Sequence, residues 1–274
     1  MVVPSIYGTK LMIHLHGHSA FITGSTQGIG KAIACAFAQA GANVLVHGER
    51  NAQEDQQVVA ECKGFGVQSQ LLTADLANIG EKELCSLCET CFSLMPKLDI
   101  LVNNAGSFFD LPYLKMSQER FDRTMNLHVR TPYFLTQAFA RHWIASRTPG
   151  RVLFVGSLNG RFAEVDSTAY DTSKGAVEMM VKTIAVALIS NGIRVNGIAP
   201  GLIRTPLTAW IDRDPKASSW MEYHTPNGQI PDAEVCGPAA VYLCSDMSDH
   251  VVGHMLTVDG GMSAWQQPPA PLSE

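Results

Sequence analysis

Short apolar runs alternate along the chain with longer segments in which apolar residues recur at helical spacing. After residue 30, for example, Ile33, Phe37 and Ala40 fall on one side of a helix. Each apolar run has the length of a buried strand. The predicted strands cover residues 20–22, 44–46, 70–73, 100–102, 152–155, 194–198 and 255–258. This alternation predicts a single α/β domain over residues 1–274, with a doubly wound parallel sheet of about seven strands and helices on both faces.

Three segments fall outside the alternation. Residues 1–14 are predicted to form an irregular N-terminal extension, and the proline-rich residues 266–274 a loose tail. Residues 202–231 form a long connection that contains two tryptophans and a tyrosine. Connections of this length in a compact domain often close over a ligand, so we expect 202–231 to be a substrate lid.

Composition and charge exclude several classes of protein. The net charge is −5 and no run of Lys or Arg occurs, which argues against a surface that binds nucleic acid or an anionic membrane. No apolar stretch approaches the length that spans a bilayer, and residues 1–17 lack the pattern of a signal peptide. The seven cysteines need not pair in a chain of this length, so we expect a reducing, cytoplasmic setting.

Three alternating histidines raise the possibility of a metal site. His14, His16 and His18 would share one face of an extended strand. No carboxylate or cysteine lies close to them in sequence. We therefore favour solvated or hydrogen-bonded histidines over a metal site.

Three closely spaced cysteines raise the same question. Cys85, Cys88 and Cys91 follow the spacing of iron–sulfur ferredoxins, but Met95 stands where the fourth cysteine ligand would be. Cys88, Cys91 and Met95 lie with Leu84 and Leu87 on one apolar stripe of a predicted helix over 81–95, where buried cysteine behaves as a small hydrophobe. We expect core packing here, and no metal.

A glycine-rich turn follows the first predicted strand. The segment Thr23-Gly24-Ser25-Thr26-Gln27-Gly28-Ile29-Gly30 runs directly into a predicted helix. Glycines let the backbone approach a pyrophosphate, and the helix N-terminus supplies N–H donors and partial positive charge. The turn predicts a Rossmann-type dinucleotide site, and the other glycine and polar signals also follow strands, at the sheet edge where such ligands bind.

Tyr170 and Lys174 lie four residues apart and so share one face of a predicted helix. A free phenol titrates near 10, and a nearby ammonium favours the phenolate. The pair is predicted to act as a proton donor and acceptor.

Together these motifs resemble the short-chain dehydrogenase/reductase family along nearly the whole chain. Ser157 precedes Tyr170 by 170 − 157 = 13 residues, as is common in that family. The matching pieces are Thr23-Gly24-x-x-x-Gly28-Ile29-Gly30, Asp75-Leu76, Asn103-Asn104-Ala105-Gly106, Asn126, Ser157, Tyr170-x-x-x-Lys174, Pro200-Gly201 with Thr205, and Val258-Asp259-Gly260-Gly261.

The resemblance implies a role for each catalytic residue. Tyr170 is the general acid/base that exchanges a proton with the substrate oxygen, and Ser157 hydrogen-bonds that oxygen. Lys174 lowers the pKa of Tyr170 and holds the ribose of the nicotinamide. Asn126 positions a water that links Lys174 to solvent. The implied cofactor-binding residues are Gly24, Thr26, Gln27, Gly28, Ile29, Gly30, Glu49, Arg50, Asp75, Leu76, Asn103, Ala105, Gly106, Tyr170, Lys174, Pro200, Gly201, Ile203 and Thr205.

The choice between NAD and NADP stays open, with NAD favoured. Members that use NAD commonly carry an aspartate at the end of the second strand, where this chain has Gly48. Glu49 can accept hydrogen bonds from the ribose and would repel a 2′-phosphate. Arg50 could bind that phosphate if the turn directs it inward. Members that use NADP often have a basic residue where this chain has Gln27.

The implied activity is NAD(P)-dependent interconversion of a secondary alcohol and a ketone. Charges in 202–231 are nearly balanced, so we expect a small polar substrate such as a sugar, polyol or hydroxy-ketone. A 3-oxoacyl thioester reductase, which uses the same catalytic residues, is the alternative. A non-catalytic dinucleotide-binding sensor is the alternative of another class, but such proteins typically lose the tyrosine or the lysine.

The family usually forms tetramers, sometimes dimers, through helices around 115–145 and 170–190. A homotetramer is therefore implied. Ala187 stands where the family often has a glutamate of that interface, which weakens the implication.

Overall fold

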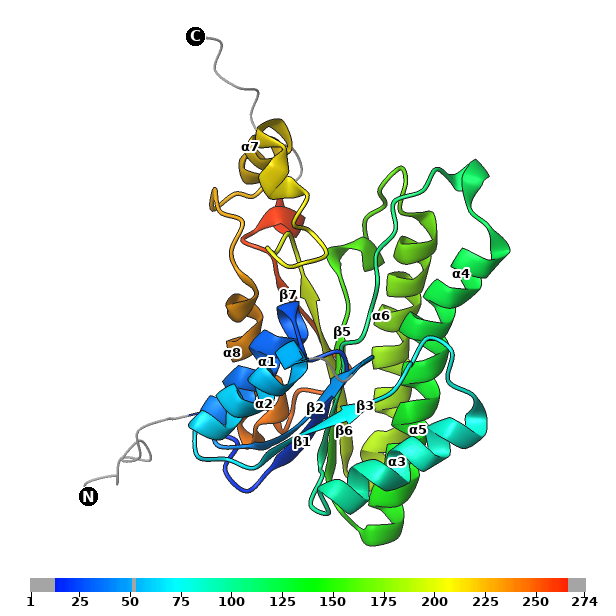
Figure 1. Ribbon diagram of the computed structural model, residues 1–274, viewed down its shortest axis with the longest axis vertical. Coiled ribbons are helices and arrows are strands. Elements are labelled where there is room, and N and C mark those ends of the chain that lie inside the picture. The colour runs from blue at the N-terminus through cyan, green and yellow to red at the C-terminus, as the bar shows by residue number, and fades with distance from the viewer. Residues whose placement is uncertain (1–12, 51–52, 266–274) are drawn as a thin grey trace, which may run out of the picture.

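A computed structural model describes residues 13–50 and 53–265, so most of the predicted extension and all of the predicted tail lie outside the described residues. One sheet of seven parallel strands runs through the domain in the order β3-β2-β1-β4-β5-β6-β7 (Figure 1). This confirms the predicted doubly wound sheet. The strands are β1 (Ser19–Ile22), β2 (Asn43–Gly48), β3 (Ser69–Thr73), β4 (Ile100–Asn103), β5 (Gly150–Val155), β6 (Ile193–Pro200) and β7 (Met255–Val258).

Helices cover both faces of the sheet (Figure 1). One face carries α1 (Gly28–Gln39), α2 (Gln53–Gly64) and α8 (Cys236–Cys244), and the other carries α3 (Glu81–Leu94), α5 (Thr131–Ser146) and α6 (Thr168–Leu188). Ala20 and Ile22 of β1 belong to the first hydrophobic cluster, while Phe21 belongs to the second and stacks on Phe139 at 5.9 Å between ring centroids. None of the described helices is long and apolar enough to cross a membrane.

The strand order reverses at β1, which pairs with β2 on one side and β4 on the other. Ile22, the last residue of β1, lies opposite Val46 and Val102. The connections from β1 and β4 leave in opposite directions, so a crevice opens at the carboxyl ends of these strands. The glycine-rich turn lies at this point.

The helical segments over residues 118–146 form one nearly continuous element. α4 (Gln118–Met125) is joined to α5 by a π-helical turn over Asn126–Arg130. The N–H of Thr131 donates to the carbonyl of Asn126, five residues back. Such wide turns often occur at functional sites.

The connection 202–231 contains more regular structure than predicted. A 3₁₀ turn (Ile211–Arg213) precedes α7 (Pro215–Tyr223), which projects at one end of the molecule (Figure 1). Asp214 caps α7 by accepting the N–H bonds of Lys216 and Ala217 at 3.0 and 3.3 Å. Proline in the first turn, as at Pro215, is also typical of a helix start.

The cysteines of α3 pack as predicted. Cys88 and Cys91 are buried in the second hydrophobic cluster together with Met95, while Cys85 is exposed. Burial raises the pKa of the Cys88 thiol to about 12. These two side chains therefore behave as small hydrophobes.

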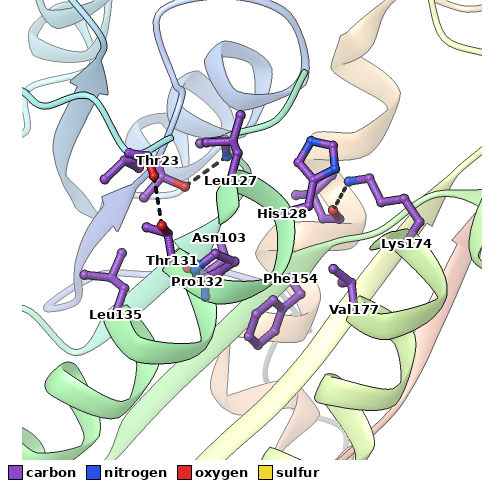
Figure 2. A pocket seen from close by; sticks show the side chains of 13 residues that line it. Thr23, Asn103, Leu127, His128, Thr131, Pro132, Leu135, Phe154, Lys174 and Val177 are labelled. Atoms are coloured by element: carbon purple, nitrogen blue, oxygen red, sulfur yellow. Dashed lines mark hydrogen bonds between the residues drawn. The ribbon is translucent and has the colours of Figure 1, made fainter. Parts of the chain in front are cut away.

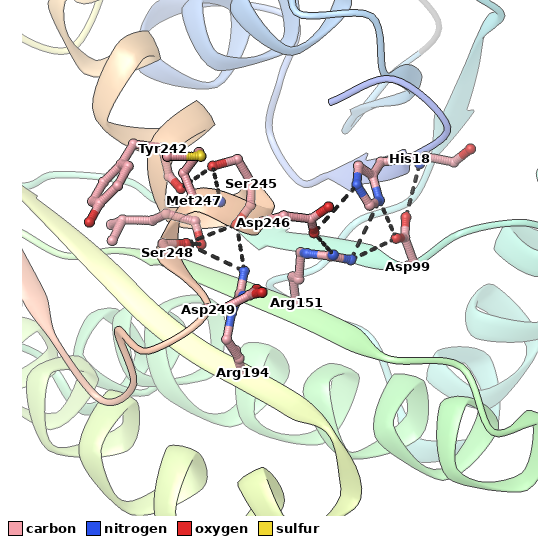
Figure 3. A network of polar contacts seen from close by, with 12 residues as sticks. His18, Asp99, Arg151, Arg194, Tyr242, Ser245, Asp246, Met247, Ser248 and Asp249 are labelled. Atoms are coloured by element: carbon pink, nitrogen blue, oxygen red, sulfur yellow. Dashed lines mark hydrogen bonds and ion pairs between the residues drawn. The ribbon is translucent and has the colours of Figure 1, made fainter. Parts of the chain in front are cut away.

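A network of charged side chains joins the amino ends of three strands (Figure 3). The Oδ2 of Asp99 lies 2.6 Å from the Nδ1 of His18 and 2.9 Å from the Nη1 of Arg151, whose Nη2 pairs with Asp246. His18 is therefore a hydrogen-bonded histidine, as the sequence favoured. His14 and His16 are exposed. Within the part of the chain that the structure describes, no group of three His, Cys, Asp or Glu side chains could hold a metal ion.

Candidate functional site

The turn after β1 approaches neighbouring backbone so closely that two glycines leave no room for a side chain. Gly24 has a left-handed φ of +60°, and a Cβ there would lie 2.9 Å from the Cα of Ala105. A Cβ on Gly30 would collide with the carbonyl oxygen of Gly24. Thr23 ties this turn to the loop after β4, because its Oγ1 accepts the N–H bonds of Asn104 and Ala105 at 2.9 and 3.0 Å.

These two loops border a cleft of about 280 Å³ at the point where the strand order reverses. α1 begins here, with no side-chain cap and no acidic residue in its first turn. Its first N–H groups and its dipole therefore favour an anion such as pyrophosphate. Of the predicted cofactor residues, those that line the cleft are Gly24, Thr26, Gln27, Gly28, Ile29, Gly30, Glu49, Asp75, Leu76, Ala105, Gly106, Tyr170, Lys174 and Thr205.

Five predicted cofactor residues do not line this cleft: Arg50, Asn103, Pro200, Gly201 and Ile203. Arg50 is exposed and follows Glu49, which does line the cleft. Ile203 is buried in the first hydrophobic cluster, and Pro200 is the buried last residue of β6. Burial within the sheet and core keeps these side chains from a ligand in the cleft.

Asn104, and not the predicted Asn103, lines the cleft. Asn103 is the last residue of β4, and its Nδ2 donates to the Oγ1 of Thr136 on α5 at 3.0 Å. Asn104 lines the cleft instead, and its Nδ2 donates to the carbonyls of Thr23 and Gly24. Asn103 ends β4 with its side chain against α5, whereas Asn104 lies in the loop that follows, beside the turn after β1.

Ser157 and Tyr170 meet at one side of the cleft. Ser157 follows β5 in extended conformation, and its Oγ accepts the N–H of Asn159 at 3.2 Å. Tyr170 lies in the first turn of α6, close enough to Ser157 for the serine hydroxyl to lower the pKa of its phenol. Lys174 lies one turn further on, with its Nζ 5.4 Å from the centre of the Tyr170 ring. The structure thus brings the three predicted catalytic side chains together.

Known proteins share both the sequence and the fold. A family model described as enoyl-(acyl carrier protein) reductase matches residues 24–263. L-Rhamnose 1-dehydrogenase (NADP(+)) of Thermoplasma acidophilum is 30% identical over 92% of this chain and 98% of its own length. 7α-Hydroxysteroid dehydrogenase of Escherichia coli K12 is 36% identical over 91% of this chain and 95% of its own. A solved 7α-hydroxysteroid dehydrogenase complexed with NADH and 7-oxo-glycochenodeoxycholic acid has a TM-score of 0.85 at 36% identity, over 91% and 95% of the two chains.

The chain belongs to the short-chain dehydrogenase/reductase family. It is an NAD(P)-dependent oxidoreductase, like the relatives above. Tyr170 and Lys174, which a non-catalytic sensor would typically lack, are both present and face the cleft.

The electrostatics of this short-chain dehydrogenase differ from the expected pattern. Burial raises the pKa of Tyr170 to about 12, and the hydrogen bond with Ser157, rather than Lys174, is the contact that lowers it. The Nζ of Lys174 donates to the carbonyl of Val155 at 3.0 Å instead. Burial lowers the pKa of Lys174 to about 8. Tyr170 is therefore protonated at neutral pH.

His128, and not Asn126, is the side chain beside Lys174. His128 and Lys174 line the same small cavity, of about 10 Å³, and lie close together in Figure 2. Asn126 lines neither this cavity nor the cleft. Side chains two positions apart on a helix do not face the same way, which corrects the role predicted for Asn126.

The sequence carried a signal for His128. It precedes Leu135 by seven residues, and Phe139 and Trp143 follow at intervals of four on the buried side of α5. Positions at these spacings share one helix face, and Asn126 is out of step with them. The apolar stripe would therefore have predicted an inward-facing His128.

His47 is a second residue that sequence reasoning missed. It is buried at the end of β2 and lines the cleft, and its Nδ1 accepts the N–H of Gly24 at 3.0 Å. Burial lowers the pKa of His47 to about 4, so the imidazole is neutral. Its Nε2 has no partner among the described residues. The signal in the sequence for His47 was its position directly before Gly48, which ends β2.

The residues present fit a nicotinamide dinucleotide. Gly24, Gly28 and Gly30 with the start of α1 would hold the pyrophosphate, in a turn whose close backbone approaches leave no room for side chains at Gly24 or Gly30. The nicotinamide, when bound, supplies or accepts the hydride. Tyr170, protonated at neutral pH, can donate to a carbonyl oxygen, and the Ser157 hydroxyl can donate to the same atom.

Proposed function

We propose that the protein interconverts a secondary alcohol and a ketone on a small polar substrate such as a sugar, polyol or hydroxy-ketone. The observation that carries this proposal is the convergence of Ser157, Tyr170 and Lys174 at the edge of the cleft, with the Lys174 Nζ 5.4 Å from the centre of the Tyr170 ring. Tyr170 would exchange the proton with the substrate oxygen, and Ser157 would hold that oxygen in place.

The segment 202–231 supports a small substrate over an acidic carrier protein. Arg204 is engaged by Asp212 at 3.2 Å and by Glu222 at 3.8 Å. Arg213 and Lys216 are also exposed, but Asp212, Asp214 and Glu222 lie in the same segment and leave no net positive charge to attract an acidic partner. The relative named L-rhamnose 1-dehydrogenase also supports a sugar-like substrate.

A bulkier alicyclic hydroxy-ketone is the second candidate. Phe108 packs edge-on against Tyr170 at 4.9 Å between ring centroids. Phe162 and Leu207, in the segments that follow Ser157 and Thr205, are about half exposed. These apolar side chains would suit one face of a ring system, and the relative at 36% identity is named for a hydroxysteroid.

We propose NAD as the favoured cofactor. Glu49 lines the cleft, where its carboxylate would accept bonds from a ribose and repel a 2′-phosphate. Arg50 is exposed outside the lining, which leaves the phosphate without its predicted cation. The named relatives include one with NADP(+) and one solved with NADH, so both cofactors occur among them.

We also propose a homotetramer assembled through α4, α5 and α6. Phe121, Phe134, Met179 and Val186 on these helices are exposed, and their burial against another copy would be favourable. Light scattering of the purified protein measures the assembly directly.

We also propose the cytoplasm as the compartment. The seven cysteines are all free, which supports a reducing setting.

A screen of alcohols and ketones with NAD(H) and NADP(H), followed at the absorbance of the reduced cofactor, tests the function. The panel should pair sugars and polyols with alicyclic hydroxy-ketones and a 3-oxoacyl thioester of matched size. Turnover of the polar set alone supports the first candidate, and turnover of the alicyclic set alone supports the second. Turnover of none of these would contradict the proposed function.

A further inference from the structure

His128 is a buried imidazole whose two ring nitrogens both have fixed partners. Its Nε2 lies 2.9 Å from the backbone nitrogen of Ser107, and its Nδ1 lies 2.8 Å from the Oγ of Ser173. His128 is 3% exposed and Ser173 is fully buried. Water therefore cannot easily replace either contact.

The direction of these hydrogen bonds selects one tautomer. A backbone N–H only donates, so the Nε2 of His128 must carry its lone pair toward Ser107. The proton of the neutral ring is then on Nδ1 and is donated to the Oγ of Ser173. That hydroxyl in turn donates to the carbonyl oxygen of Tyr170 at 2.6 Å. Every donor in this chain has an acceptor.

The chain of bonds connects the loop after β4 with the part of α6 that carries Tyr170 and Lys174. Ser107 follows the loop after β4 that borders the cofactor cleft. Ser173 lies on α6 between Tyr170 and Lys174, and the His128 ring packs edge-on against the Tyr170 ring at 5.6 Å between centroids. The phenol is thereby fixed relative to the cleft.

We propose that His128, as the neutral Nδ1–H tautomer, is a positioning residue that fixes the catalytic helix α6 against the loop after β4. The proposal rests on the proposed function of Tyr170 and Lys174, because small displacements of a catalytic group cost rate. A charged imidazole could not accept from Ser107. Burial, and next the ammonium of Lys174, keep the pKa of His128 well below its usual range.

The tautomer is tested without any turnover. Long-range ¹H–¹⁵N correlation spectra of the full chain, labelled with ¹⁵N-histidine and recorded at neutral pH, report which ring nitrogen carries the proton. The His128 signals are those absent from His128→Gln. We expect a protonated Nδ1 and an unprotonated Nε2. An Nε2–H tautomer or an imidazolium would overturn the proposal, even if no substrate is found and the proposed function fails.

Kinetics then test the positioning role. His128→Phe keeps a flat ring of similar size and removes both hydrogen bonds. Because a buried donor and a buried acceptor are left unpaired, we expect kcat to fall at least about tenfold. The Kd of the cofactor should change less than about twofold. His128→Gln, whose amide oxygen can accept from Ser107, should recover part of the loss. Unchanged kcat in His128→Phe, or equal losses in kcat and cofactor affinity, would contradict the role.

A control and a second route keep the test independent of folding. His142 on α5 is exposed and stacks on Phe92 at 3.6 Å, so His142→Phe should leave kcat unchanged. If His128→Phe does not fold, Ser173→Ala leaves the imidazole in place and removes the acceptor of Nδ1 together with the hydroxyl bond to the Tyr170 carbonyl. We expect a kcat loss of about three- to tenfold in that variant. Normal kcat in a folded Ser173→Ala enzyme would also overturn the proposal.

Discussion

The ammonium of Lys174 donates to the carbonyl oxygen of Val155 at 3.0 Å, where β5 ends. The side chain is nearly fully buried, and burial lowers its pKa from 10.5 to about 8. Between these two values the unfolded chain binds more protons at Lys174 than the folded protein does. The contribution of Lys174 to stability must therefore rise with pH across that window.

Lys174→Met tests this relationship. Below pH 8 the buried Lys174 is charged in the folded protein, and this charge lowers the stability of the fold. Relative to Lys174→Met, the unfolding free energy of the wild type should therefore rise by about 2 kcal/mol between pH 7 and 9.5. Urea unfolding at both pH values measures it. Lys182→Met, on the exposed side of α6, is the control and should show no such rise. A difference that does not change with pH would show that the charge is not buried in solution.

Replacing Tyr170 by Phe should nearly abolish turnover and leave the fold intact. The phenol is the group proposed to exchange the proton, and losing a general acid lowers kcat by about a hundredfold or more. Cofactor affinity should stay within about twofold, because the pyrophosphate cradle is unchanged. Tyr242→Phe on α8 is the matched control. Near-normal turnover in purified Tyr170→Phe would remove Tyr170 from the mechanism.

Cofactor preference should respond to Glu49 and not to Arg50. Glu49→Gln removes the charge that faces the cleft, so kcat/KM with NADP should rise about tenfold relative to that with NAD. Arg50→Ala should change the ratio less than about twofold, since Arg50 is exposed outside the cleft lining. Steady-state kinetics with both cofactors decide the matter. A strong NADP preference that is lost in Arg50→Ala would show that Arg50 faces the ribose.

The segment 202–231 should resist trypsin only when cofactor and substrate are both bound. Lys216 at the start of α7 is exposed and offers a cleavage site. Arg204 ties the segment together through Asp212, Glu222 and the carbonyl of Ile230. Arg204→Gln should therefore speed cleavage in the free enzyme. Equal cleavage rates with and without ligands would argue against a lid.

Much of the fold follows from local patterns in the sequence. Each predicted run lies within an observed strand. The central strands β1 and β4 are almost entirely apolar because they are buried on both faces. Gly24 and Gly30 mark the turn after β1 because no other residue fits the close backbone approaches there. Tyr170 and Lys174 share a face because they lie one helical turn apart. Spacing along the chain is enough to predict each of these features.

Other features depend on how separate elements pack. Asn103 and Asn104 are adjacent and chemically identical, and their contacts with Thr136 on α5 and with the turn after β1 decide which one lines the cleft. The π-helical turn between α4 and α5 sets which side chain reaches Lys174, and so His128 takes the place predicted for Asn126.

The protonation states of the site also depend on how separate elements pack. A nearby ammonium predicts a lowered pKa for Tyr170, but the ammonium of Lys174 is bound to Val155 and burial dominates. Burial and the direction of a hydrogen bond depend on contacts between residues far apart in sequence. Motif spacing therefore predicts which side chains form the candidate site, and the packing of α6 against β5 and the loop after β4 determines their charge and orientation.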